Sequence, residues 1–69
     1  MMATEFVRRY AAARRAYHAN DDAGLYSHMD ELSANCTTEQ WSMVDWAFDN
    51  GAPEYRLVKR WADRNGDEA

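Results

Sequence analysis

Few side chains in this sequence could bind a metal ion or act as a nucleophile, and they lie far apart. His18, His28 and Cys36 are the available nitrogen and sulfur ligands, and none of their spacings matches a zinc motif. His28 and Glu31 stand three residues apart, which could bring an imidazole and a carboxylate onto one helical face but is also the spacing of an ordinary solvated pair. No basic residue near Cys36 in the sequence would activate its thiol. We therefore expect no metal site, no cofactor and no catalytic cysteine.

Adjacent carboxylates are the remaining candidates for acid–base chemistry. Catalysis by such a pair requires one carboxyl group to lie in an apolar pocket beside a substrate cleft. The pairs Asp21-Asp22 and Asp30-Glu31 instead suit helix caps and solvated helix faces. The chain has no glycine-rich phosphate loop, and its 69 residues leave little room for a cleft of ordinary ligand size. The sequence thus predicts a protein that is not an enzyme and has no catalytic residues.

The distribution of charge is the most pronounced pattern in the chain. Residues 20–55 contain eight carboxylates and no lysine or arginine, and all eight basic residues lie outside this segment. Segregation of this kind favours a surface for a charged partner. Several of the carboxylates suit the positive end of a helix. The four that capping does not explain are Asp30, Glu31, Asp45 and Asp49, unless arginines of the terminal segments fold back onto them.

Helical periodicity predicts the elements that must position these side chains. The expected helices span residues 5–19, 25–35 with a start near Asp21 or Asp22, 38–50 and 53–64. No segment alternates at period two for long enough to predict a strand. The sequence therefore predicts an all-α fold, a compact bundle of three to four short helices with short connections, forming a single domain over residues 1–69.

Capping residues predict where these helices begin and end. Thr4 is the expected N-cap of the first helix. Thr37 and Gln40 have the spacing of a capping box before the third helix, and Gly51 suits the left-handed position that ends it. Pro53 suits the first position of the fourth helix, which Asn65-Gly66 should end.

The third predicted helix is apolar over an unusually wide arc. Trp41, Val44 and Phe48 form one stripe, which we assign to the core. Met43 and Trp46 lie off that stripe, and a helix with apolar residues on more than one side is either central or meets a second surface. Tryptophan and methionine are enriched at interface centres. We therefore expect Met43 or Trp46 to be the apolar anchor for a partner.

The same region also has part of the spacing of a helix-turn-helix motif. Ala47 is a small residue in the first helix, Gly51 lies in the turn, and Leu57 is an apolar residue in the second helix. Two features oppose this interpretation: the second apolar position is occupied by Arg60, and carboxylates beside the turn would repel a phosphate backbone. If the motif were real, the side chains that contact DNA would be Arg56, Lys59, Arg60 and Arg64.

The favoured interpretation is a non-enzymatic protein-binding module. Its partner would be a basic protein surface, such as that of a nucleic-acid-binding complex, and Asp30, Glu31, Asp45 and Asp49 would supply steering and pairing. Small size, one-signed charge and the lack of catalytic apparatus are also the general profile of phage-encoded anti-CRISPR and anti-restriction proteins. Direct DNA binding and self-association are the alternatives. A single cysteine and the lack of a membrane-length apolar run favour a cytoplasmic setting with no membrane partner.

Overall fold

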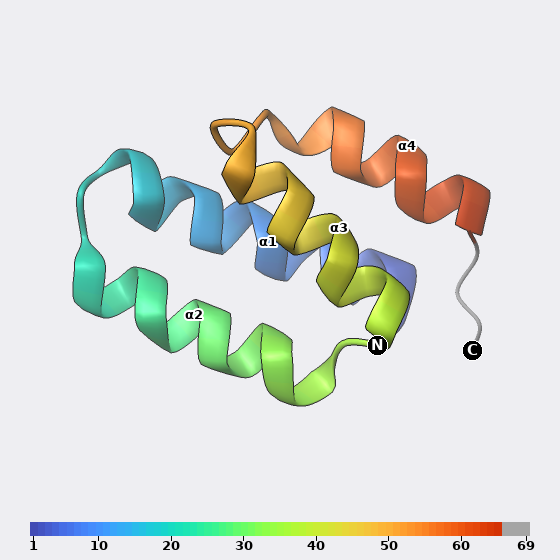
Figure 1. Cartoon of the computed structure of the whole chain (residues 1–69), viewed down its shortest axis with the longest axis horizontal. Coiled ribbons are helices and arrows are strands. Elements are labelled where there is room, and N and C mark those ends of the chain that lie inside the picture. Colours follow the sequence, from blue (N-terminus) through green and yellow to red (C-terminus); the bar gives the residue numbers. More distant parts are fainter. Residues whose placement is uncertain (66–69) are drawn as a thin grey trace.

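The computed structural model describes residues 1–65, and this part of the chain forms four α-helices and no strand (Figure 1). The helices are α1 (Ala3–His18), α2 (Asp22–Asn35), α3 (Thr38–Asp49) and α4 (Tyr55–Asn65). The predicted all-α bundle is therefore confirmed. Gly66, which was expected to end the last helix, lies outside the described residues. No helix of residues 1–65 has both the length and the apolar character needed to cross a membrane.

Side-chain caps begin the two middle helices as the sequence predicts. The Asp21 carboxylate accepts a hydrogen bond from the Gly24 amide (3.0 Å) at the start of α2. A Cβ at Gly24 would require the Asp21 carboxylate to shift from its capping position. At the start of α3, the Thr37 hydroxyl accepts from the Gln40 amide (3.1 Å), and the Gln40 side chain accepts from the Thr37 amide (2.9 Å). This is the predicted capping box.

The predicted start of α1 at Thr4 is wrong, because the helix begins earlier. Ala3 is its first residue, the N-cap position is Met2, and no side chain caps it. The reason is tertiary: the Gln40 side-chain amide donates a hydrogen bond to the Met1 carbonyl (2.6 Å), and Met1 packs against the core. With its first residue held in this way, the chain enters the helix at Ala3, one residue before Thr4.

The connection between α3 and α4 also differs from the prediction. The helix ends as expected with Gly51 at a φ of +86°, but Ala52 also has a positive φ, +53°, and is almost fully buried. The Ala52 amide donates to the Ala47 carbonyl (2.8 Å), which closes the end of α3. Two successive left-handed residues turn the chain through Pro53, which therefore precedes α4 instead of opening it.

Helix α1 is the helix against which both α2 and α4 pack. Its fully buried residues Phe6, Tyr10 and Ala13 occupy the centre of the core. The other helices each contribute small or branched apolar side chains at helical spacing, which lets them approach closely. These side chains are Leu32 of α2, Val44 and Ala47 of α3, and Val58 and Ala62 of α4.

A row of polar side chains on α1 binds the α3–α4 connection. The Tyr10 hydroxyl donates to the Pro53 carbonyl (2.6 Å), and the Arg14 Nε donates to the Ala52 carbonyl (2.9 Å). The His18 Nε2 also lies 3.2 Å from the Ala52 carbonyl. The three side chains are four residues apart and so share one face of α1. They satisfy carbonyl groups that a non-helical turn against the core would otherwise leave without partners.

The hydroxyl of Tyr10 should contribute measurably to stability. Replacing Tyr10 with Phe removes the hydrogen bond to Pro53 and leaves that carbonyl without its donor, so we expect a loss of about 1 kcal/mol in the free energy of unfolding. Tyr17→Phe is the matched control, because both rings pack edge-on against Phe48 but the exposed Tyr17 hydroxyl has no hydrogen-bond partner among residues 1–65. Urea denaturation followed by circular dichroism measures both variants, and equal stabilities would contradict this role.

Candidate functional site

The described residues contain no constellation suited to metal chemistry. No three His, Cys, Asp or Glu side chains within residues 1–65 converge on a point that could hold a metal ion. The spacing of His28 and Glu31 does not produce a pair, because the Glu31 carboxylate accepts a hydrogen bond from Arg9 of α1. His18 lies on the α3–α4 connection. Cys36 is partly buried at the end of α2, and this burial raises the pKa of its thiol.

The four carboxylates singled out from the sequence do not form one patch. Glu31 forms an ion pair with Arg9, so one arginine of α1 does fold back onto the acidic segment. The same Arg9 binds Glu5 (2.6 Å), and its hydrogen bond, with that of Arg8, lowers the pKa of the Glu5 carboxyl. Asp30 on α2 is exposed and has no cationic partner among residues 1–65. The charge of Glu31 is therefore partly compensated within the fold, and that of Asp30 is not.

Asp45 and Asp49 lie on the outward face of α3. They are one helical turn apart, exposed, and without an ion-pair partner in the described part of the chain. Trp41 lies one turn before Asp45 and is 36% exposed. Trp46 lies on the other flank of the helix and is 47% exposed. The two carboxylates therefore lie between two solvent-accessible indole rings.

Two predictions about the apolar residues of α3 are wrong. Trp41 was assigned to the core but is exposed, because the covered arc of α3 runs through Met43, Ala47 and Val44 to the half-buried Phe48, and Trp41 lies at its edge. Met43 was expected to be an exposed anchor but is only 9% exposed and belongs to the core cluster. Trp46, the other expected anchor, remains accessible. Periodicity gave the width of the apolar arc but not the part of it that the other helices cover.

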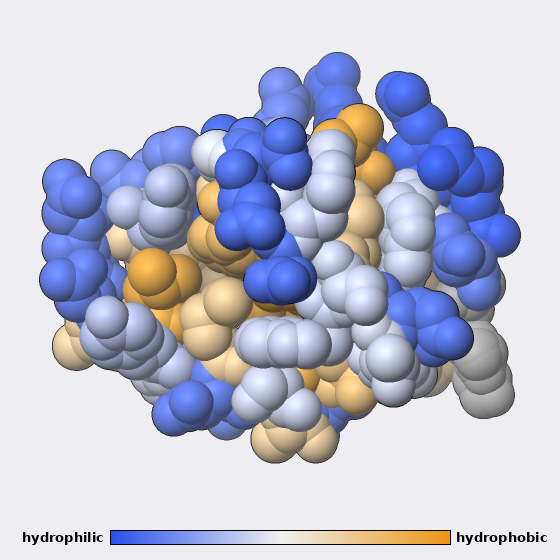
Figure 2. Space-filling view, viewed as in Figure 1, coloured by the Kyte–Doolittle hydropathy of each residue, from blue (hydrophilic) through white to orange (hydrophobic). Residues whose placement is uncertain are grey.

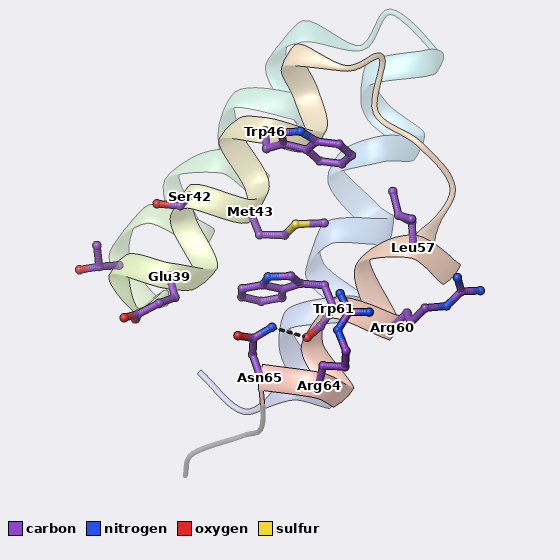
Figure 3. A pocket seen from close by; sticks show the side chains of 10 residues that line it. Glu39, Ser42, Met43, Trp46, Leu57, Arg60, Trp61, Arg64 and Asn65 are labelled. Carbon is purple, nitrogen blue, oxygen red and sulfur yellow. Dashed lines mark hydrogen bonds between the residues drawn. The ribbon is translucent and has the colours of Figure 1, made fainter.

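A groove of about 630 Å³ runs between α3 and α4. Figure 3 shows that the Trp46, Met43 and Trp61 side chains extend into it from the two helices, with Leu57 across from Trp46. Beneath the groove the Trp61 ring packs against Phe6 of α1, with ring centroids 5.8 Å apart. The floor is therefore apolar and aromatic, and it is continuous with the core.

Charged side chains line the groove with opposite sign on its two sides. Glu39 lies on the α3 side, and Arg60 and Arg64 lie on the α4 side (Figure 3). None of these three forms an ion pair with another residue in the range 1–65. The sequence reasoning did not identify Glu39, Leu57 or Trp61 as site residues. The spacing of four that repeats in Leu57/Trp61 and Arg60/Arg64 was the available signal, because it places an apolar row beside a basic row on one helix.

The basic residues of α4 divide into two groups. Arg56 lies 4.0 Å from Glu54, and Lys59 binds Asp63 (3.0 Å), so these two cations have acidic neighbours. Arg60 and Arg64 are without such neighbours among residues 1–65. In Figures 1 and 3 α4 runs back along α3 in the opposite direction. Leu57, the expected apolar anchor of a helix-turn-helix, is 39% exposed and so is not enclosed between the two helices.

The part of the chain that the structure describes is thus a four-helix bundle with an acidic, tryptophan-flanked face on α3 and an apolar groove beside it. Figure 2 shows pale and orange side chains over much of the face that includes α3, with strongly hydrophilic side chains around its edge and in a band that reaches the middle of this face. No protein-family model, no curated protein and no solved structure matches this chain.

The thiol of Cys36 should react slowly in the folded protein. Because burial raises its pKa, a smaller fraction is present as thiolate at a given pH, and partial burial also limits access. We expect Cys36 to react with a disulfide reagent such as DTNB at pH 8 more slowly than the same thiol in the urea-unfolded chain. A faster reaction in the folded protein would mean that the thiol is activated, and it would reopen a catalytic or redox role.

Proposed function

We propose that the protein is a non-enzymatic binding module that docks a basic surface of another protein through the outward face of α3. The observation that supports this best is the placement of Asp45 and Asp49, which are exposed one turn apart without a cationic partner among residues 1–65. Trp41 and Trp46 flank them and supply apolar area beside the charges. An exposed pair of carboxylates next to indole rings is a combination suited to an interface.

The electrostatics favour a partner of positive charge. Uncompensated carboxylates on one helix face create a local negative potential that attracts a basic surface and orients it during encounter. Asp30 on α2 adds to this potential because its charge is not paired within residues 1–65. Glu31 contributes less than its sequence position suggests, since Arg9 partly compensates its charge. The tryptophans then add contact area once the partner is oriented.

The class of partner that best fits is a protein that itself binds nucleic acid. The basic grooves of such proteins are lined by lysine and arginine to hold phosphates, and an acidic helix face can occupy them in place of a nucleic acid. A small acidic domain acting in this way in the cytoplasm would inhibit or regulate nucleic-acid-handling machinery. Phage anti-CRISPR and anti-restriction proteins have this general profile, and the proposed mode of action is analogous to theirs in type.

Neutralising the α3 carboxylates should weaken capture of the partner. We propose affinity capture from the source cell, followed by measurement of the captured protein's binding to wild type and to the D45N/D49N variant. The variant should associate on the order of tenfold more slowly at low ionic strength, with a flatter salt dependence, because it has lost the charges that steer the encounter.

The matched control is E54Q/D63N, which removes the same amount of negative charge from residues paired on or beside α4. It should bind as wild type does. If D45N/D49N and E54Q/D63N behave alike, the effect is one of net charge and the α3 face is not the docking site. If neither variant changes binding, the acidic docking mode is wrong.

A second candidate function is duplex DNA binding through α4. Arg60 and Arg64 support it, because both are exposed and neither is engaged by a carboxylate within residues 1–65. The wild-type protein would then retard a mixed-sequence duplex in a gel at low salt, and R56A/R60A would abolish the shift. The control R8A/R15A removes two exposed charges from α1 and should leave the shift unchanged. Absence of any shift with wild type would exclude this function.

A further inference from the structure

We infer that the groove between α3 and α4 is the interface of a two-fold dimer of this chain. This inference goes beyond the proposed function. It uses the α4-facing flank of α3, including Trp46, and leaves Trp41, Asp45 and Asp49 on the outward face for another partner. The floor of the groove gives the first reason. Trp46 and Leu57 are 47% and 39% exposed, and between them the groove opens onto Met43 and Trp61. Accessible aromatic and aliphatic area of this kind is stabilised by being covered.

The sign of the charges identifies the occupant. The α3 side of the groove carries Glu39 and the α4 side carries Arg60 and Arg64, and all three lack an ion-pair partner among residues 1–65. A partner segment must therefore offer apolar side chains with positive charge on one edge and negative charge on the other. The groove itself has this composition, so a second copy meets both requirements.

A two-fold axis can bring the oppositely charged sides of the two grooves together. An axis that runs along the groove in the plane of the interface places α3 of each copy over α4 of the other, and each contact then occurs twice. In Figure 3, following the groove along its length, Glu39 lies across from Arg64 and Asn65, and Trp46 lies across from Leu57. Rotation about this axis does not change the position of a residue along the groove. Glu39 of one copy therefore meets Arg64 of the second copy, and Trp46 meets Leu57 of the second copy.

A contact of this kind would cover a large share of the surface of so small a chain. A standard interface covers about 800 Å² of each partner, whereas the whole chain exposes 4463 Å². A dimer contact of standard size would therefore cover roughly a fifth of the surface of each copy. Two α3–α4 pairs packed face to face form a four-helix arrangement, a common way for helices to bury such a seam. A chain of 69 residues also benefits from burial between copies, because its own core is small.

Charge reversal on each side of the groove tests the inference. Sedimentation equilibrium should show wild type in a concentration-dependent monomer–dimer equilibrium. R60E/R64E places like charges opposite Glu39 of the second copy, and E39R/S42R places like charges opposite Arg60 and Arg64. Each reversal should lower the dimer association constant by about tenfold or more. An equimolar mixture of the two variants should recover dimer, because the altered sides are then complementary.

Three outcomes would overturn the inference. The first is a wild type that stays monomeric at about 1 mM, a concentration at which even a weak dimer forms. The others are reversal variants that dimerise as wild type does, or a mixture that stays monomeric although circular dichroism shows both variants folded. D45N/D49N should remain dimeric, since those residues face outward. A monomeric D45N/D49N would mean that the dimer forms through the outward face of α3 and not through the groove. A monomeric wild type that binds an amphipathic acidic peptide in the groove would identify another protein as the occupant. Neither that result nor a failed dimer would affect capture of a basic partner by the α3 face.

Discussion

The hydrogen bonds from α1 to the α3–α4 connection are the constraint on which the rest of this structure depends. Tyr10 and Arg14 donate hydrogen bonds to the carbonyls of Pro53 and Ala52, and this fixes where the chain turns after α3. The turn needs a positive φ at Ala52, a conformation that costs a non-glycine residue about 1 kcal/mol or more. Burial of the alanine and the two hydrogen bonds offset that cost. Because α4 begins after this turn, the same contacts fix where α4 lies beside α3 and so determine the groove between them.

This arrangement explains why apolar surface remains accessible in so small a protein. Helix α1 provides the central surface, and α2 and α4 pack on it. Helix α3 contributes Met43, Val44 and Ala47 to the core, and its Phe48 packs against Tyr10 of α1. The small side chain of Ala47 fits between helices, whereas the indole rings of Trp41 and Trp46 do not and stay at the edges of α3. The two tryptophans are thus available to partners as a consequence of how the core is filled.

The charged side chains are divided in a similar way: some are paired within the fold, and others are available to a partner. Arg8 and Arg9 are engaged by Glu5, and Arg9 also reaches Glu31, so the basic end of α1 compensates part of the acidic segment. Exposed pairs of this kind contribute little stability, but they change the potential seen by a partner. The uncompensated charges among residues 1–65 include a negative pair on the outside of α3 and a positive pair on the groove side of α4. One small fold therefore presents two surfaces of different sign.

The sequence by itself determined the four helices and most of their boundaries, because periodicity and capping are local properties. The Asp21 cap, the Thr37–Gln40 capping box and the left-handed Gly51 were all predictable from a few neighbouring residues. Which apolar side chains are covered was decided only by the tertiary structure: Met43 is buried and Trp41 is exposed because the other helices cover the arc of α3 that includes Met43, Ala47 and Val44, and Trp41 lies at the edge of that arc. The pairing of Glu31 with Arg9, across 22 positions of sequence, and the opposite charges on the two sides of the groove likewise arise from contacts between helices, which local spacing does not encode.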